Sequence, residues 1–224
     1  MSEQENVKVE EMADFFNNRA GTYDSHMKET INSFNEYYLT ISDGIVETND
    51  IVEILDLGCG TGLEIEGILK KVPNARITCI DLSEGMLKLL DDKYKDYKNQ
   101  LTIINNSYLT HPFEMNKYDY VVSVMTMHHF KYEDKCALYK KIKGSLKEDG
   151  KYIEGDYVVS SENELLWLEK YDKILSEIGD KKIKLYHIDI PFSLETQKKL
   201  LKEAGFNNFE IMFEEGEHFI YCVC

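Results

Sequence analysis

Three glycines at alternate positions, Gly58, Gly60 and Gly62, follow an apolar segment, and glycines at this density let a backbone approach a ligand closely. Asp56 stands just before the first glycine, where its carboxylate would repel a phosphate. The spacing is one residue short of the dinucleotide fingerprint, and no Gly-Lys-Ser/Thr sequence follows that would make a phosphate-binding loop. The loop therefore favours a ligand with a cationic end.

A second acid, Asp81, ends the next strand-like segment, about 20 residues after the glycines, where nucleotide-binding folds place a ribose contact. The two oxygens of a carboxylate can accept hydrogen bonds from both hydroxyls of a ribose. Together the two acids predict a nucleoside ligand with an amino or sulfonium group near Asp56.

Histidines are the candidates for proton transfer. His128 and His129 follow a β-branched segment, and His187 precedes Asp189 in the sequence LYHIDIP. A general base is needed if the group that reacts carries a proton at neutral pH. These side chains could also converge on a metal ion, but neither HxxxH nor HExxH occurs, so we expect no metal site.

The composition narrows the class of protein. The chain has 224 residues and a formal net charge of −15, which argues against a nucleic-acid partner, because a phosphate-binding face is expected to be basic. No segment approaches the ~20 apolar residues of a membrane span, and the acidic N-terminus is unlike a secretory signal. We expect a cytoplasmic protein of one domain with a sizeable core and no contact with a membrane.

Strands and helices alternate along the chain and must position these residues. Expected strands cover residues 51–57, 75–82, 101–106, 118–125 and 150–159. Expected helices cover residues 61–72, 83–94, 132–146, 161–180 and 193–204, with Thr61 and Ser83 as caps. The alternation predicts a parallel sheet with helices on both faces. Two last strands, within 206–213 and 215–224, have so short a link that they must be antiparallel.

At this point the chain resembles the class I S-adenosylmethionine-dependent methyltransferases, of the type that acts on small molecules. The resemblance rests on DLGCGTG at 56–62, on Asp81, on INNSYL at 104–109 and on YDYVVSVMTMHHF at 118–130. It runs from about residue 15 to the end of the chain. It implies an α/β, Rossmann-like fold whose seven-stranded, mostly parallel sheet ends in an antiparallel hairpin.

The resemblance also implies roles for single residues, with S-adenosylmethionine as cofactor. The methionine part of the cofactor would face Asp56 and the backbone of Gly58, Cys59, Gly60 and Gly62. Asp81 would bind the ribose, and Leu82 and Met86 would pack on the adenine. Asn106 and Ser107 would contact the adenine edge, and Ser123 or Val124 would lie near the reactive methyl group. Many relatives have Asp where Asn106 stands, but an amide can still hydrogen-bond an amino group.

Further residues are expected on the acceptor side. Residues 1–50 would form a helical lid, with Arg19 and Tyr23 near the substrate, within a single domain of residues 1–224. Residues 160–192 would form a helical insertion over the acceptor, with Trp167 and Tyr171 as pocket lining and His128, His129 and His187 as catalytic candidates. The alternatives are an NAD-dependent oxidoreductase, a non-catalytic S-adenosylmethionine-binding protein and an RNA methyltransferase. The sequence assigns neither the acceptor nor an oligomeric state.

Overall fold

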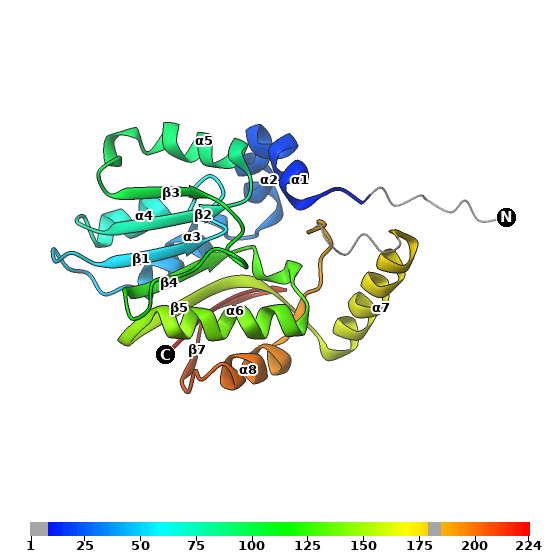
Figure 1. Cartoon of the computed structure of the whole chain (residues 1–224). Coiled ribbons are helices and arrows are strands. Elements are labelled where there is room, and N and C mark those ends of the chain that lie inside the picture. Colours follow the sequence, from blue (N-terminus) through cyan, green and yellow to red (C-terminus); the bar gives the residue numbers. More distant parts are fainter. Residues whose placement is uncertain (1–8, 179–184) are drawn as a thin grey trace.

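The computed structural model describes residues 9–178 and 185–224, and a β-sheet covered by helices on both faces forms its centre (Figure 1). The strands are β1 (Glu53–Leu57), β2 (Arg76–Asp81), β3 (Leu101–Asn105), β4 (Tyr118–Val124), β5 (Leu146–Val159), β6 (Phe192–Ser193), β7 (Phe209–Glu215) and β8 (His218–Val223). Seven of them follow the order β3-β2-β1-β4-β5-β8-β7, and β6 pairs with β5 beside this path.

The direction of the strands confirms the expected topology. Strands β1 to β5 are parallel, whereas β8 runs antiparallel to both β5 and β7. The expected number of strands was one too low for the described residues, because the two-residue β6 adds a parallel pairing with β5. So short a strand gives no readable alternation in the sequence.

The helices are α1 (Met12–Arg19), α2 (Tyr23–Thr30), α3 (Phe34–Asp43), α4 (Ile65–Lys71), α5 (Glu84–Lys93), α6 (Tyr132–Ser145), α7 (Ser161–Ile178) and α8 (Leu194–Glu203). Short 3-10 turns occupy Ala20–Thr22 (η1), Lys95–Tyr97 (η2) and Met127–His129 (η3). Most of residues 12–43 are therefore helical, as expected for this part of the chain. No helix in the described ranges is long and apolar enough to cross a membrane.

Two hydrophobic clusters hold the helices on the sheet, because successive side chains of a strand point to opposite faces. In β1, Ile54 packs in the cluster that includes α3, α4 and α5, whereas Leu55 packs in the cluster that includes α6 and α8. Both side chains are fully buried. With both faces covered, the loops at the carboxyl edge of the parallel strands are the part of the sheet left to carry a site.

Of the two helix caps expected from the sequence, one is present in the structure and the other is not. Ser83 caps α5 as expected, since its side chain accepts the N–H of Met86. The expected cap at Thr61 was wrong: α4 begins at Ile65, with Glu64 at the N-cap position. The hydroxyl of Thr61 instead donates to Asp24 of α2, at 2.5 Å. The longer glycine loop that results carries part of the site.

The N-terminal segment pairs with the segment that follows α7. Glu11 forms an isolated antiparallel bridge with Tyr186. The N–H of Met12 donates to the carbonyl of Leu185 at 2.8 Å, and the N–H of His187 donates to the carbonyl of Glu10 at 3.0 Å. These bonds hold α1 and the segment after α7 together at the carboxyl edge of the sheet.

Candidate active site

The glycine loop between β1 and α4 has a backbone that suits glycine. Gly58, Gly60 and Gly62 have φ angles of +68°, +50° and +71°, which side chains rarely tolerate. A Cβ on Gly58 would stand 2.5 Å from Oγ1 of Thr126, so the loop packs very closely against the end of β4. The loop therefore presents bare backbone at the carboxyl edge of the sheet.

Asp81 lies beside this loop. Its Oδ2 accepts the N–H of Gly60 at 2.9 Å, and its Oδ1 accepts the N–H of Ser83 at 2.7 Å. Each carboxylate oxygen retains acceptor capacity for a further hydrogen bond. Burial raises the pKa of Asp81, while the N–H groups of Ser83 and Gly60 oppose that shift. The side chain is thus held beside the loop, with acceptor capacity left on both oxygens.

A cavity, the loop cavity, opens between the glycine loop and α1. Several residues expected to bind the cofactor line it: Gly58, Gly60, Asp81, Leu82, Met86 and Ser107. Two further residues of the described wall, Tyr23 and His129, were expected on the acceptor side. The remaining residues of the described wall were not singled out from the sequence: Met12, Phe16, Tyr108, Met125, Thr126, Phe130 and Leu185. Tyr108 follows β3 and Thr126 follows β4, so position at a strand end could have indicated both.

Other residues expected at the cofactor lie outside the wall of the loop cavity: Asp56, Cys59, Gly62, Asn106, Ser123 and Val124. The hydroxyl of Ser123 is buried within the sheet, 2.7 Å from the hydroxyl of Tyr152. Asn106 accepts the N–H of Ser107 at 2.8 Å, which positions a residue that does line the cavity. Their contacts with a cofactor stay predictions.

Asp56 and Glu64 are neighbouring carboxyl groups buried beneath the glycine loop. Asp56 is fully buried, and Glu64 is 4% exposed. Burial, and then the charge of Glu64, raise the pKa of Asp56 well above its usual value. Burial likewise raises the pKa of Glu64. The pair therefore favours a bound proton, and a cation reaching the loop would favour its release.

A second cavity, the histidine cavity, adjoins the first. The walls of both share Phe16, Tyr23, Met125 and His129. The rest of the described wall of the histidine cavity comes from α1, η1, α2, the end of β5, η3 and the segment after α7: Phe15, Arg19, Thr22, Ser25, His26, Met27, Glu29, His128, Tyr157, His187 and Asp189. The three catalytic candidates thus meet in one wall.

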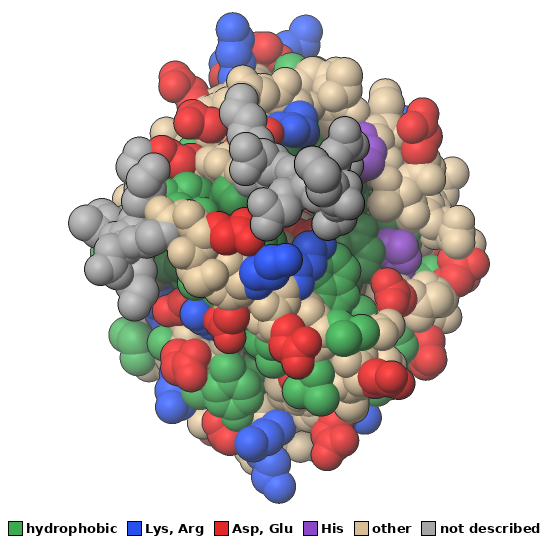
Figure 2. All heavy atoms as spheres, turned by 90° about the vertical axis from the view of Figure 1, so that its right-hand side faces the viewer, with side chains coloured by type: hydrophobic (Ala, Val, Ile, Leu, Met, Phe, Trp, Pro, Cys, Tyr) green, Lys and Arg blue, Asp and Glu red, His purple; other side chains and the backbone are tan. Residues whose placement is uncertain are grey.

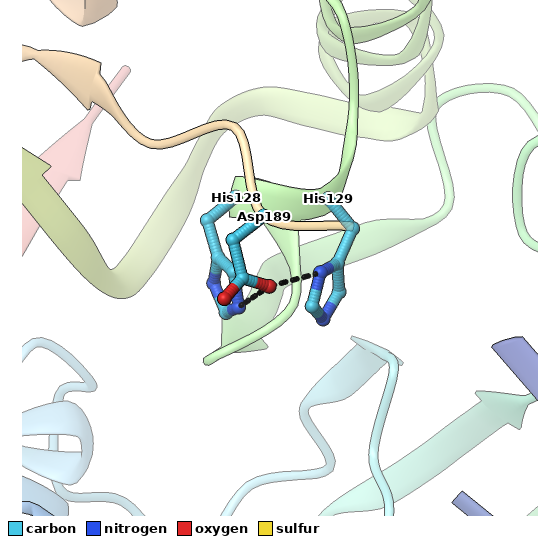
Figure 3. Close-up of side chains that lie close together, drawn as sticks. All are labelled: His128, His129 and Asp189. Atoms are coloured by element: carbon cyan, nitrogen blue, oxygen red, sulfur yellow. Dashed lines mark ion pairs between the residues drawn. The ribbon is translucent and has the colours of Figure 1, made fainter. Parts of the chain in front are cut away.

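Asp189 lies among these three histidines. Its Oδ1 is 3.2 Å from Nδ1 of His129 and 3.8 Å from Nε2 of His128. Figure 3 shows the carboxylate between the two imidazole rings. Nε2 of His187 lies 3.9 Å from the same oxygen. The His187 ring is stacked on Phe15, with 3.4 Å between centroids, so a helix of the N-terminal segment helps to position the cluster.

The opposite side of His128 is held by Asp156 of β5, a residue that sequence reasoning missed. Nδ1 of His128 lies 2.5 Å from Oδ1 of Asp156, and the backbone N–H of His128 donates to Oδ2 at 2.9 Å. Asp156 is fully buried. An acid between buried positions of a strand is the signal that could have indicated it.

Burial and charge set the protonation of the cluster. Burial, with the charge of His128, lowers the pKa of His129 to about 4. Burial also lowers the pKa of His187. At His128 the charges of Asp156 and Asp189 outweigh burial and raise the pKa. At Asp189 the histidines outweigh burial and hold the pKa below its usual value. The cavity wall therefore offers neutral imidazole at His129 and His187 beside a carboxylate.

The N-terminal helices contribute to the walls of both cavities. Arg19 lines the histidine cavity but is paired with Glu10 at 3.1 Å, and its guanidinium lies 3.7 Å from the centre of the Phe15 ring. Tyr23 lies in both walls. Asn17, which sequence reasoning missed, joins α1 to the start of α5: its Oδ1 accepts the N–H of Gly85 at 2.9 Å and lies 2.7 Å from Oγ of Ser83.

The structure does not bring Trp167 and Tyr171 to either cavity. Both lie on α7, which projects beside α6 and α8 (Figure 1). The Nζ of Lys170 lies 4.3 Å from the Trp167 ring centre, and Tyr171 packs against the cluster on the α6 and α8 face. Within the insertion, the segment after α7 supplies the residues that line the cavities: Leu185, His187 and Asp189.

Residues 54–150 match the family model described as a methyltransferase domain. The carboxy-S-adenosyl-L-methionine synthase of Nautilia profundicola is 26% identical over 93% of this chain and 92% of that protein. The synthase of the same name from Sulfurimonas denitrificans is 30% identical over 70% of this chain and 71% of its own. The DhpI–SAH complex has a TM-score of 0.70 at 14% identity, covering 95% of this chain and 94% of its own.

The chain belongs to the class I S-adenosylmethionine-dependent methyltransferases. It is an enzyme of that family, and S-adenosylmethionine is its cofactor. Membership argues against the alternative of an NAD-dependent oxidoreductase, in agreement with the short glycine spacing.

Proposed function

We propose that this enzyme transfers the methyl group of S-adenosylmethionine, held in the loop cavity, to a small molecule held in the histidine cavity. One observation carries the proposal: two adjoining cavities share Phe16, Tyr23, Met125 and His129. Methyl transfer is an in-line displacement, so the donor and the acceptor must lie next to each other, as ligands in two adjoining cavities would. In this arrangement the methyl group passes beside His129.

The chemistry demands little of the protein beyond placement. The sulfonium already activates the methyl group, so the enzyme aligns the acceptor and excludes water. An acceptor with a hydroxyl, thiol or ammonium group must also lose a proton. His128, His129, His187 and Asp189 supply the lone pairs and the negative charge for that step on the acceptor side.

The size and charge of the site favour a small acceptor. The N-terminal segment and the segment after α7 pair with each other, and both contribute side chains to the cavity walls. Figure 2 shows acidic and basic side chains interspersed over the described part of this face, with histidines beside hydrophobic side chains. The net charge of −15 also disfavours RNA.

Carboxylation of the cofactor is the second candidate, because relatives matching most of the chain are named carboxy-S-adenosyl-L-methionine synthases. A carboxylated methyl group would place a second negative charge near Asp189. Arg19, the only Arg or Lys in the described wall of the histidine cavity, is paired with Glu10. The described wall therefore offers no unpaired guanidinium or ammonium group for the carboxylate of such a product.

Two measurements test the proposed function. Calorimetry should show binding of S-adenosylmethionine and S-adenosylhomocysteine, with no binding of NAD. Mass spectrometry after incubation with small-molecule extracts should show S-adenosylhomocysteine together with a methylated acceptor. A carboxylated cofactor as product would instead support the second candidate, and cofactor binding without any turnover would support a non-catalytic protein.

A further inference from the structure

Two polar atoms in the wall of the histidine cavity are buried without a hydrogen-bond partner among the described residues: Nδ1 of His129 and Oδ1 of Asp189. Buried polar atoms are nearly always paired in proteins. These two atoms form an ion pair at 3.2 Å, although their geometry is not that of a hydrogen bond. A cation at a point between them would pair with both the carboxylate oxygen and the imidazole nitrogen.

A third atom converges on the same point. One ligand atom each of His128, His129 and Asp189 lies within 4.8 Å of the other two. Figure 3 shows the carboxylate of Asp189 between the two rings, with His128 and His129 coming from η3 and Asp189 from the segment after α7. Two imidazoles and one carboxylate are a ligand set that transition-metal ions use when further positions stay open to substrate.

Asp156 prepares His128 for this role. Because its carboxylate lies at Nδ1 of the ring, the proton of the neutral imidazole is held there and the lone pair is at Nε2, facing Asp189. Metal-binding histidines characteristically donate their other ring N–H to a carboxylate, which fixes the tautomer and the orientation of the ring. The backbone N–H of His128 donates to the same carboxylate.

We propose that His128, His129 and Asp189 bind a divalent transition-metal ion, and that the acceptor is a small molecule whose hydroxyl or thiol group binds this ion. The claim about the acceptor rests on the proposed function, whereas the claim about metal binding does not. The site differs from the sequence-based expectation of no metal, because its ligands come from segments about 60 residues apart in the chain and follow no local spacing.

The metal ion makes the acceptor a nucleophile by lowering the pKa of the bound hydroxyl or thiol. The O–H or S–H bond breaks, and the proton passes to a solvent water molecule. The oxygen or sulfur lone pair then forms the bond to the methyl carbon. The bond from that carbon to the sulfonium breaks, and its electrons remain on sulfur, leaving S-adenosylhomocysteine. The oxidation state of the metal does not change.

The test is metal binding by the full chain in the absence of cofactor and acceptor. After removal of metal with a chelator, calorimetry with Zn²⁺ and visible absorption with Co²⁺ should both give one site per chain. His129→Gln and Asp189→Asn should each weaken Zn²⁺ binding at least about 100-fold. Asp156→Asn, which changes a positioning residue, should weaken it about 10- to 100-fold.

Controls keep the result interpretable. His111→Gln removes a histidine outside both cavities and should leave the Zn²⁺ affinity unchanged, and circular dichroism should show that each variant is folded. Absence of a Zn²⁺ site in the wild-type chain, or a site that survives both His129→Gln and Asp189→Asn, overturns the metal proposal. Failure of S-adenosylmethionine to bind would overturn the proposed function and leave the metal result standing.

Discussion

The carboxylate of Asp81 accepts the backbone N–H of Gly60 at 2.9 Å, and this hydrogen bond joins the end of β2 to the glycine loop after β1. The glycine loop therefore orients this acid. The position of Asp81, together with its charge, supports the prediction that it binds the ribose of the cofactor.

Asp81→Ala should weaken S-adenosylmethionine binding at least about tenfold, because two ribose hydroxyls would lose a charged acceptor. Calorimetry measures the change directly. Asp92→Ala removes an exposed acid from α5 and serves as the matched control. Unchanged affinity in Asp81→Ala would remove this residue from the cofactor site.

Gly58→Ala should lower the free energy of unfolding by about 1–3 kcal/mol, because the φ of +68° is unfavourable for alanine and its Cβ would meet Thr126. Urea denaturation measures it. At Gly21 a Cβ meets nothing within 4 Å, so Gly21→Ala is the control and should not destabilise the chain. Equal stability of the two variants would contradict the described loop geometry.

The buried pair of Asp56 and Glu64 predicts how stability depends on pH. The folded state raises the pKa of Asp56, so it binds this proton more tightly than the unfolded chain does. Stability from this group is therefore greatest at low pH and falls as pH rises above the unfolded value of about 4. Asp56→Asn should abolish that fall, so its stability relative to wild type should increase from pH 4 to pH 8 in denaturation experiments. A relative stability that decreases over this range would contradict the buried pair.

A second prediction on protonation concerns His128, whose pKa is raised by neighbouring charges and not by burial. The charge of Asp156 helps to raise the pKa of His128, so Asp156→Asn should lower it in the metal-free protein. NMR titration of the histidine ring protons measures this change. The stabilisation from the charged pair is complete below the unfolded pKa of about 6.5 and is lost as pH rises through the folded pKa. A pKa that does not fall in the variant would show that Asp156 does not act on this ring.

Asn17→Ala tests whether the N-terminal helices act as a lid. Loss of the Asn17 contacts with Ser83 and Gly85 should free α1 from α5, so hydrogen exchange in α1 should accelerate. Cofactor dissociation should accelerate with it. Asn74→Ala, at a side chain that binds the carbonyl of Asn49 far along the chain from α1, is the control. Unchanged exchange in α1 would argue against the lid.

Much of the fold could be predicted because its signals are local. The apolar run that ends in Asp56, the glycine loop and the short link before β8 each depend on neighbouring residues, and the structure confirms the topology they predict. The start of α4 was misjudged because Thr61 binds Asp24, a partner from α2 that no local pattern reveals.

The acceptor side could be predicted only in part. The sequence singled out His128, His129 and His187 by residue type, but their convergence on Asp189 depends on the path of the segment after α7. Its place on the insertion suggested Trp167 as pocket lining, whereas the described walls of the two cavities do not include this α7 side chain. Tertiary position, which spacing does not encode, decides which residues of an insertion reach a site.

In the proposed function, a methyl group passes from the loop cavity to a small molecule in the histidine cavity. Transfer can be followed with S-adenosylmethionine that carries a radioactive methyl group, incubated with the wild-type chain and fractionated small-molecule and RNA extracts. We expect label in a small-molecule fraction together with S-adenosylhomocysteine, and a strong reduction of both in Asp81→Ala. Label in RNA, or bound cofactor that never yields S-adenosylhomocysteine with any fraction, would contradict it.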